Sequence, residues 1–230
     1  MLQVEIINIG DELLIGQVVN TNASQMAQKL NSYGFNVLAT SVIGDSGNQI
    51  RESLDIALKR ADCVLITGGL GPTKDDITKK ILAEYFESGL IINKEVEQHV
   101  KSYFTRKQLP FTETNRAQAL VPEKCKVIFN PVGTAPGMCF EKNGKLIVSM
   151  PGVPFEMRLM MEKVIEIMQK FFNQCTKILH KTLLYANIGE SFLSDMICDF
   201  EDTLPKYISL AYLPKSNTIR LRLTAKTDED

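Results

Sequence analysis

Short apolar runs alternate with amphipathic segments over the first 170 residues or so of the chain. The runs have the length of buried strands, and in the segments between them apolar residues recur at the spacing of a helix. The strands expected are Val4–Ile9, Phe35–Ile43, Val64–Ile66, Val127–Phe129, Met138–Phe140 and Leu146–Met150, and the main helices are Asn22–Leu30, capped by Thr21 or Asn22, a helix after Gly44-Asp45-Ser46, Ile77–Phe86, Lys94–Lys107 and Phe155–Phe171. Because strands that alternate with helices form βαβ units, this order predicts an α/β fold. Its core is a doubly wound, mostly parallel sheet with helices on both faces.

The pattern changes near residue 173. An alternating run over Lys177–Leu184, a helix over Glu190–Phe200 and a hairpin over 208–225 predict a small α+β unit. We therefore expect one domain at residues 1–171 and a second unit at residues 172–230. The sequence ends with Thr227-Asp228-Glu229-Asp230 directly after a strand, which is consistent with a truncated unit and a fragment of a longer protein.

Composition narrows the class of protein. Apolar residues make up 44% and charged residues 23% of the chain, as in ordinary globular proteins. A net charge of −1, without a basic block interleaved with aromatic residues, argues against a nucleic-acid partner. No apolar run approaches the roughly 20 residues that span a membrane, and Met1–Leu14 lacks the basic start of a signal peptide. We expect a cytoplasmic protein with no membrane partner.

Cysteine and histidine usage limits the kind of metal site. The chain has five cysteines without a Cys-x-x-Cys pair, which predicts reduced, mostly buried thiols. They are Cys63, Cys125, Cys139, Cys175 and Cys198. With two histidines only, a metal would be held by oxygen ligands, which favours Mg²⁺, Mn²⁺ or a similar divalent ion.

The stretch from Thr67 to Thr78, TGGLGPTKDDIT, carries the most chemistry. Glycines after a strand let the backbone approach an anion, and the next helix adds its positive N-terminal end. Asp75 and Asp76 would repel that anion unless a cation lay between them, so the stretch predicts a phosphate and a divalent metal together. A plain strand-to-helix turn with two dipole-compensating acids is the simpler reading of either feature alone. The stretch matches neither a Walker loop nor a dinucleotide fingerprint.

Four loops are expected at the same edge of the sheet, beyond the carboxyl ends of its strands. They are Gly10-Asp11-Glu12, Gly68–Thr78, Asn130–Gly137 and Pro151–Glu156. Each loop on its own is explained by a turn or a helix start. Their common location makes this edge the candidate site.

Five motifs in these segments resemble those of the competence/damage-inducible protein CinA family. They are Gly10-Asp11-Glu12-Leu13-Leu14, Asn20-Thr21-Asn22, Thr67–Thr78, Gly133-Thr134-Ala135-Pro136-Gly137 and Pro151-Gly152-Val153-Pro154-Phe155-Glu156-Met157. The resemblance covers residues 1 to about 170 and implies the molybdopterin-binding fold and a metal-dependent ADP-ribose pyrophosphatase, which forms AMP and ribose 5-phosphate. Residues 171–230 resemble the start of the small middle domain of that family. The deamidase domain that many members carry is not part of this sequence, so deamidation is not assigned to it. Many relatives have Asp where this chain has Asn20, which weakens a ligand role for that position.

Roles follow from the loop chemistry and the resemblance together. Asp75 and Asp76 are expected to hold Mg²⁺, Mn²⁺ or Co²⁺, with Asp11 or Glu12 assisting or acting as base. The residues expected to bind the ADP-ribose-like nucleotide are Gly68, Gly69, Gly71, Thr78, Asn22, Gly133, Thr134, Pro136, Gly137, Pro151, Gly152 and Glu156. A monovalent cation such as K⁺ is a further candidate cofactor, and a homodimer is expected.

Two alternatives remain open from the sequence. The same loop and metal would serve adenylyl transfer to molybdopterin in molybdenum cofactor biosynthesis. A non-catalytic module that binds a nucleotide or a pterin is the other alternative, and the adjacent Asp75 and Asp76 argue mildly against it.

Overall fold

The computed structural model describes residues 2–173 and 177–227, and the chain divides into two compact units. The first comprises Met1–Leu30 and Phe35–Asn173, and the second comprises Asn31–Gly34 and Gln174–Asp230. Cys175 and the acidic end Asp228–Asp230, on which the sequence raised expectations, lie outside the described residues.

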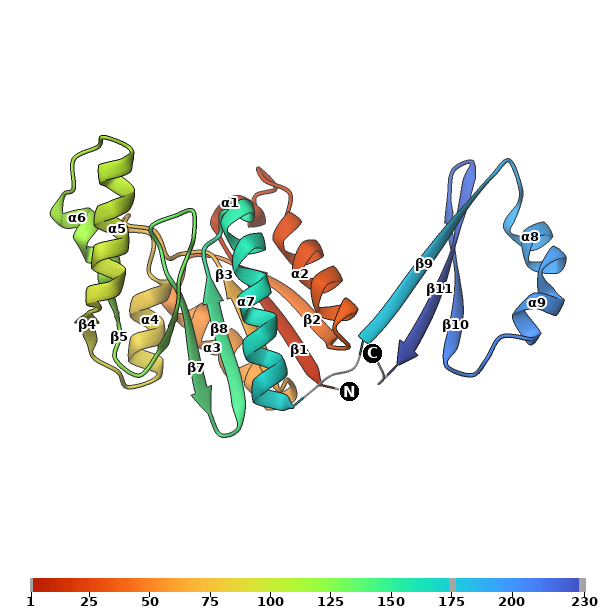
Figure 1. Ribbon diagram of the computed structural model, residues 1–230, viewed down its shortest axis with the longest axis horizontal. Coiled ribbons are helices and arrows are strands. Elements are labelled where there is room, and N and C mark those ends of the chain that lie inside the picture. The colour runs from red at the N-terminus through yellow and green to blue at the C-terminus, as the bar shows by residue number, and fades with distance from the viewer. Residues whose placement is uncertain (1, 174–176, 228–230) are drawn as a thin grey trace. The chain divides into compact units, whose positions relative to one another are not determined.

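A six-stranded sheet forms the centre of the first unit (Figure 1). Its spatial order is β2 (Asn36–Ile43), β1 (Gln3–Ile9), β3 (Cys63–Thr67), β8 (Lys145–Met150), β7 (Gly137–Lys142) and β6 (Lys126–Ile128). The first four strands are parallel, and β7 runs antiparallel to both of its neighbours. Asn143 and Gly144 both have positive φ in the β7–β8 turn, as a tight hairpin requires. The mostly parallel α/β sheet expected from the sequence is confirmed.

Helices cover both faces of this sheet. Residues that alternate along β1 and β3, such as Ile6 and Ile7, are almost completely buried, which requires a cover on each side. The main helices are α2 (Thr21–Ser32), α3 (Gly47–Arg60), α4 (Thr78–Tyr85) and α7 (Pro154–Phe172). One face packs against α3 and α4 through Leu54 and Leu82. Met161 and Val164 of α7 are also buried, so the apolar side of this long helix packs against the rest of the unit.

Several local expectations were wrong. The cap of α2 is Asn20, whose Oδ1 accepts a hydrogen bond from Ala23 N at 3.1 Å, and not Thr21 or Asn22. Two three-residue strands, β4 (Leu90–Ile92) and β5 (Leu120–Pro122), pair with each other and were not predicted.

Helix α5 (Lys94–Arg106) buries Val96 and Val100 in a small satellite core with Ala119. The short helices α1 (Asp11–Leu14), α6 (Glu113–Arg116) and η1 (Ala117–Ala119) complete the unit.

The second unit is a three-stranded antiparallel sheet with two short helices. Its strands are β9 (Lys177–Ala186), β10 (Ile208–Lys215) and β11 (Thr218–Thr227), in the order β10, β11, β9, and its helices are α8 (Glu190–Met196) and α9 (Cys198–Asp202). Leu193, Ile219 and Leu221 form its core. The single helix predicted over Glu190–Phe200 is therefore two helices.

The described cysteines are free thiols, as expected, but their burial differs. Cys63 and Cys139 are buried, Cys125 is half-buried and Cys198 is exposed. Burial raises the pKa of Cys125 to about 12 and that of Cys139 to about 11, which keeps these thiols protonated at neutral pH. Within the described ranges, no helix is both long and apolar enough to cross a membrane.

Candidate functional site

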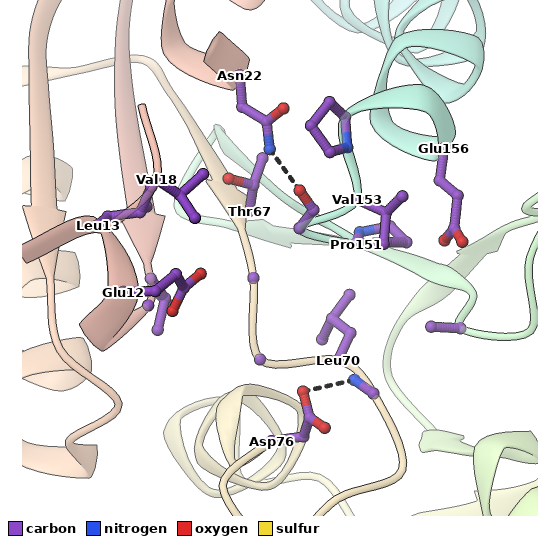
Figure 2. A pocket seen from close by; sticks show the side chains of 18 of the residues that line it. Glu12, Leu13, Val18, Asn22, Thr67, Leu70, Asp76, Pro151, Val153 and Glu156 are labelled. Carbon is purple, nitrogen blue, oxygen red and sulfur yellow. Dashed lines mark hydrogen bonds between the residues drawn. The ribbon is translucent and has the colours of Figure 1, made fainter. Parts of the chain in front are cut away.

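The largest group of predicted site residues meets at the carboxyl ends of the parallel strands. β1 lies between β2 and β3, so the strand order changes direction at β1, and ligands of open α/β sheets bind at such a switch point. A pocket of about 480 Å³ lies at this edge, and we call it the glycine pocket. Figure 2 shows Glu12, Leu13 and Val18 on one side of it and Val153 and Glu156 on the other.

The loop after β3 forms one wall of the glycine pocket. Gly68 has φ 106° and Gly69 has φ 66°, values that other residues rarely adopt. A Cβ on Gly68 would collide with the Ile9 carbonyl oxygen, and a Cβ on Gly69 would collide with Thr78 Oγ1. Only glycine fits both the φ values and the space at these two positions. The two glycines let the loop pass close to the end of β1 and the start of α4.

Asp76 fixes the shape of this loop. Its Oδ1 accepts a hydrogen bond from Gly71 N at 2.8 Å, and its Oδ2 accepts bonds from Thr73 N at 2.9 Å and from Thr73 Oγ1. Figure 2 shows the Asp76 carboxylate turned toward the loop backbone. Both oxygens are thus engaged within the loop, although Asp76 also lines the pocket.

The amides of the loop are not equally available to a ligand. Gly68 N donates to Met150 O at 3.2 Å, and Gly71 N donates to Asp76. Within residues 2–173 and 177–227, the N–H groups of Gly69 and Leu70 donate to no protein acceptor. Both residues line the pocket, so their amides are candidates to bind an anion there.

Thr78, the first residue of α4, packs against the glycine loop and does not line the pocket. Its side chain is completely buried, and its N–H donates to Gly69 O at 3.1 Å. Its Oγ1 has no hydrogen-bond partner among the described residues. A direct contact between Thr78 and a phosphate in the pocket is therefore not supported.

Three further carboxylates approach the pocket from different loops. Glu12 follows β1, Asp45 follows β2 and Asp75 follows the glycine loop. Burial raises the pKa of Asp45, and the negative charges of Glu12 and Asp75 raise it further. This mutual influence places the three acids in one electrostatic cluster.

Asp11 holds Asp45 of this cluster in place through two hydrogen bonds. Its N–H donates to Asp45 Oδ2 at 3.1 Å, and Asp45 N donates to Asp11 Oδ1 at 3.3 Å. The first of these bonds lowers the pKa of Asp45, against the effects of burial and charge. Asp11 therefore joins the loops after β1 and β2 and does not line the pocket.

The donor set fits a divalent ion that is shared with a ligand. Among the described residues, no three Asp, Glu, His or Cys side chains lie close enough together to form a metal site by themselves. Mg²⁺ commonly uses one or two carboxylates and completes its shell with water and substrate phosphates. Asp75 is exposed at the pocket, and the nearby Thr73 hydroxyl lowers its pKa, so it is ionised and accessible.

Asn22 lines the pocket and has a buried side-chain acceptor, Oδ1. Its Nδ2 donates to Gly152 O at 2.7 Å, which fixes the orientation of the amide (Figure 2). Only 8% of the residue is exposed, and Oδ1 has no partner within the part of the chain that the structure describes. Such a buried acceptor suits a ligand that donates an N–H or O–H group.

The wall opposite the glycine loop is held by Asn130 and Glu156. Asn130 Nδ2 donates to Glu156 Oε2 at 2.7 Å, and Asn130 Oδ1 accepts a bond from Gly133 N at 2.9 Å. A Cβ on Gly133 would lie 2.5 Å from Glu156 Cδ, so this glycine allows the loop to pack against α7. Asn130 was not singled out from the sequence.

The structure separates the predicted residues into two groups. Those that line the glycine pocket are Glu12, Asn22, Gly68, Gly69, Gly71, Asp75, Asp76, Thr134, Pro151, Gly152 and Glu156. Those that do not line it are Asp11, Thr78, Gly133, Pro136 and Gly137. Gly137 lies within β7, where a Cβ would lie 2.5 Å from Met160 Cε, so its role is packing.

Sequence reasoning missed Asp45, Leu13, Val18 and Val19 as pocket residues. Asp45 follows Gly44 directly after a parallel strand, and that position could have identified it. Val18 and Val19 are exposed apolar residues in a loop, and no local pattern marks them.

Comparison with known proteins gives the same division of the chain. Residues 5–170 match the family model described as “Probable molybdopterin binding domain”, and residues 180–230 match that of the “Damage-inducible protein CinA KH domain”. A CinA-like protein of Flavobacterium psychrophilum is 46% identical over 98% of this chain, and one of Cytophaga hutchinsonii is 40% identical over 97%. The chain spans about half, 54%, of the length of each of these relatives.

Solved structures agree with the fold. A crystal structure of the protein CinA from Thermoplasma acidophilum, titled as having unknown function, is 34% identical. It covers 73% of this chain and 96% of its own, with a TM-score of 0.63. The molybdopterin biosynthesis enzyme MoaB from Thermus thermophilus has a TM-score of 0.51 over 76% of this chain and 98% of its own. At 18% identity it shows a common fold only.

The family matches, the motifs and the fold lead to one conclusion: the chain belongs to the CinA family, with a molybdopterin-binding type of domain followed by a CinA KH domain.

Proposed function

We propose that the first unit hydrolyses a nucleotide pyrophosphate in a metal-dependent reaction, and that ADP-ribose is split into AMP and ribose 5-phosphate. One observation carries this proposal. Gly69 and Leu70, whose amides have no acceptor among the described residues, line a pocket that also holds five carboxylates. Anion donors beside a cluster of acids fit a ligand that brings phosphates and a cation together.

Gly69 and Leu70 are the residues that we assign to the pyrophosphate. Neither amide donates to an acceptor within residues 2–173 and 177–227, and Gly69 has no side chain to keep a phosphate away. The amides of Gly68 and Gly71 hold the loop in place. The pyrophosphate is therefore assigned to Gly69 and Leu70, whereas the sequence suggested Gly68, Gly69 and Gly71.

Asp75 and Glu12 are the residues that we assign to the cation. Both line the pocket, and both offer carboxylate oxygens, the ligands that hard divalent ions prefer. A bound divalent ion supplies positive charge against the phosphate oxygens. Asp76 is assigned to positioning, because its two oxygens already hold Gly71 and Thr73.

Asp45 is the residue that we assign to accepting a proton from the attacking water. It lines the pocket, and its pKa is raised by burial, which makes it a better base than an ordinary aspartate. Asp11 keeps the Asp45 side chain in place through the bond from its N–H. The sequence had given this role to Asp11 or Glu12.

The apolar side of the pocket suits the base of the nucleotide. Leu13, Val18 and Val153 line it, and the free Asn22 Oδ1 can accept a bond from an amino or hydroxyl group. A pterin has the same features as a purine, a flat ring with amino groups. This similarity keeps adenylyl transfer to molybdopterin as the second candidate.

Turnover of ADP-ribose tests the proposal. The 230-residue chain is incubated with ADP-ribose in Mg²⁺, Mn²⁺ or Co²⁺, and AMP is measured by chromatography. We expect AMP with a divalent ion and none with a chelator. Asp75→Asn should lower the rate on the order of a hundredfold, the usual effect of removing an electrostatic group.

Controls separate the alternatives. Glu141→Gln changes an acid of the same unit that does not line the pocket and should leave the rate unchanged. AMP transfer to molybdopterin from ATP, without ADP-ribose hydrolysis, would favour the second candidate. Tight nucleotide binding without turnover in any of the three ions would refute catalysis and favour a binding module.

A further inference from the structure

A second cavity of about 440 Å³ lies in the first unit, at the other end of the sheet. It is bounded by the last turns of α7 and by β6, β7 and the start of β8. Leu146, the second residue of β8, lines it, whereas the glycine pocket begins where β8 ends at Met150. Figure 1 shows α7 running beside β8, so the cavity is a groove between this helix and the edge of the sheet. We call it the lysine groove.

Lysines dominate the walls of this groove. Lys124 and Lys126 come from β6 and the turn before it, and Lys163 and Lys170 come from α7. The described lining also holds the acids Glu141 and Glu166, so four positive charges face two negative ones. This excess contrasts with the net charge of −1 for the whole chain.

Internal ion pairs leave much of this positive charge available. Lys163 Nζ pairs with Glu166 Oε2 at 2.6 Å, and Lys124 Nζ donates to Phe86 O at 3.1 Å. Within residues 2–173, Lys126 and Lys170 form neither an ion pair nor a hydrogen bond through their ammonium groups. Both side chains are exposed, so they can reach a ligand without breaking a protein contact.

The floor of the groove is apolar. Leu146 and Cys139 are buried beneath it, and Ile167 and Phe171 of α7 are half-buried along its side. Apolar side chains below a cationic rim match a ligand with a hydrophobic body and an anionic group. A volume of about 440 Å³ lies in the range of small-molecule sites, roughly 300 to 1,000 Å³.

We propose that the lysine groove is a second ligand site, which binds a small aromatic anion that carries a phosphate or carboxylate group. Lys126 and Lys170 contact the anionic group from opposite walls, and Ile167 and Phe171 pack against the ring. The ammonium group of lysine binds phosphate as a point charge, which suits a rim made of flexible side chains. This proposal is independent of the reaction at the glycine pocket.

Binding of 1-naphthyl phosphate tests the site. It has an aromatic ring and one phosphate, and its binding to the whole 230-residue chain is followed by titration calorimetry and by amide chemical shifts. The experiment is done with a chelator present, because we expect the acids of the glycine pocket to repel an anion when no cation is bound. We expect shifts at Lys126, Ile167 and Phe171, and weaker binding at high salt.

Charge-matched variants locate the effect. Lys126→Gln with Lys170→Gln should weaken binding at least tenfold. Lys94→Gln with Lys101→Gln removes the same charge from exposed positions of α5 and should change the affinity less than twofold. ADP-ribose turnover should be the same in both double variants.

Three results would overturn the proposal. One is the absence of binding at millimolar 1-naphthyl phosphate. Another is a set of shifts confined to Gly68–Gly71. The last is an equal loss of affinity in the two double variants, because it would show a general effect of net charge. If only a poly-glutamate peptide binds, the groove recognises an acidic chain and the small-molecule assignment is wrong.

Discussion

The glycine pocket and the lysine groove have similar volumes, about 480 and 440 Å³, and lie at opposite ends of one sheet. They differ in what builds them. The glycine pocket is formed by glycine backbone at positive φ and by carboxylates bonded to that backbone, such as Asp76. The lysine groove is formed by long side chains mainly on helices and strands. The backbone of these elements does not depend on those side chains. We therefore expect substitutions of the residues that hold the glycine loop to change function and stability together, and substitutions in the lysine groove to change binding alone.

Asp76→Ala should have the largest effect. It leaves the N–H groups of Gly71 and Thr73 without their acceptor. Because Gly71 is only half-buried and Thr73 is exposed, water can replace the lost bonds, and the cost should be about 1 kcal/mol. The loop that presents the Gly69 and Leu70 amides then loses its shape, and ADP-ribose turnover should fall on the order of a hundredfold. AMP release and urea unfolding measure the two effects, and the fold should survive.

Asp75→Asn is the matched comparison for Asp76→Ala. Asp75 is exposed, so its replacement should change the free energy of unfolding by less than about 0.5 kcal/mol. Turnover should still fall strongly. If Asp76→Ala lowered turnover with no loss of stability, the positioning role of Asp76 would be wrong and a direct role in binding the cation would be favoured.

Gly69→Ala should have the next largest effect. The new methyl group would meet Thr78 Oγ1, and the φ of 66° is unfavourable for alanine. Overpacking and backbone strain together should destabilise the unit by about 3 kcal/mol, as measured by urea unfolding.

Two variants separate the causes of that loss. Gly144→Ala has a similar φ of 73° but nothing within 4 Å of the new Cβ, so it should cost about 1 kcal/mol. Adding Thr78→Ala to Gly69→Ala should recover most of the overpacking part. Equal losses for Gly69→Ala and Gly144→Ala would mean that contact with Thr78 does not matter.

The fold and the glycine pocket were largely predictable because their determinants are local. Apolar runs and helical spacing gave the main strands and helices, and the sequence TGGLGPTKDD marked the pocket loop. β4 and β5 were missed because each has only three residues and pairs only with the other. The predicted cap of α2, Thr21 or Asn22, was one or two residues late because Asn20, Thr21 and Asn22 are all good caps.

Side-chain direction and long-range assembly could not be predicted. Thr78 and Gly137 belong to the family motifs, but Thr78 is completely buried at the start of α4 and Gly137 lies against Met160 of α7, so neither lines the pocket. Asp45 resembles an ordinary residue at a helix start, and its place in the acidic cluster depends on pairing between β1 and β2. The lysine groove has no motif, because Lys126 and Lys170 come from separate elements.

Lys79, in α4 after the glycine loop, should give a smaller effect, a pH dependence of the free energy of unfolding. A lysine of the lysine groove should not show it. Burial lowers its pKa from 10.5 to about 8, although Asp76 opposes the shift, and its Nζ donates to Ala117 O. The folded state therefore releases this proton before the unfolded state does, and stability should rise with pH between about 8 and 10.5. The full difference corresponds to about 3 kcal/mol, and we expect roughly 2 kcal/mol because the side chain is partly exposed.

The free energy of unfolding in urea, measured from about pH 7 to 10.5, checks this expectation. Lys79→Met should flatten the rise, because the methionine has no proton to release. Lys126→Met changes an exposed lysine of the groove and should keep the rise as it is in the unmodified protein. A rise that persists in Lys79→Met would assign the pH dependence to another group.

Glu141→Gln should have the smallest effect, and it tests the lysine groove in the direction of a gain. Glu141 is exposed at the rim, so its negative charge opposes the bound anion only weakly through solvent. Removing that charge should tighten the binding of 1-naphthyl phosphate about two- to threefold, with stability and ADP-ribose turnover unchanged. A gain at low salt that disappears at about 0.5 M salt would identify the cause as charge. A loss of affinity would instead mean that Glu141 holds a lysine in place, and the groove would then depend on its own contacts as the glycine pocket does.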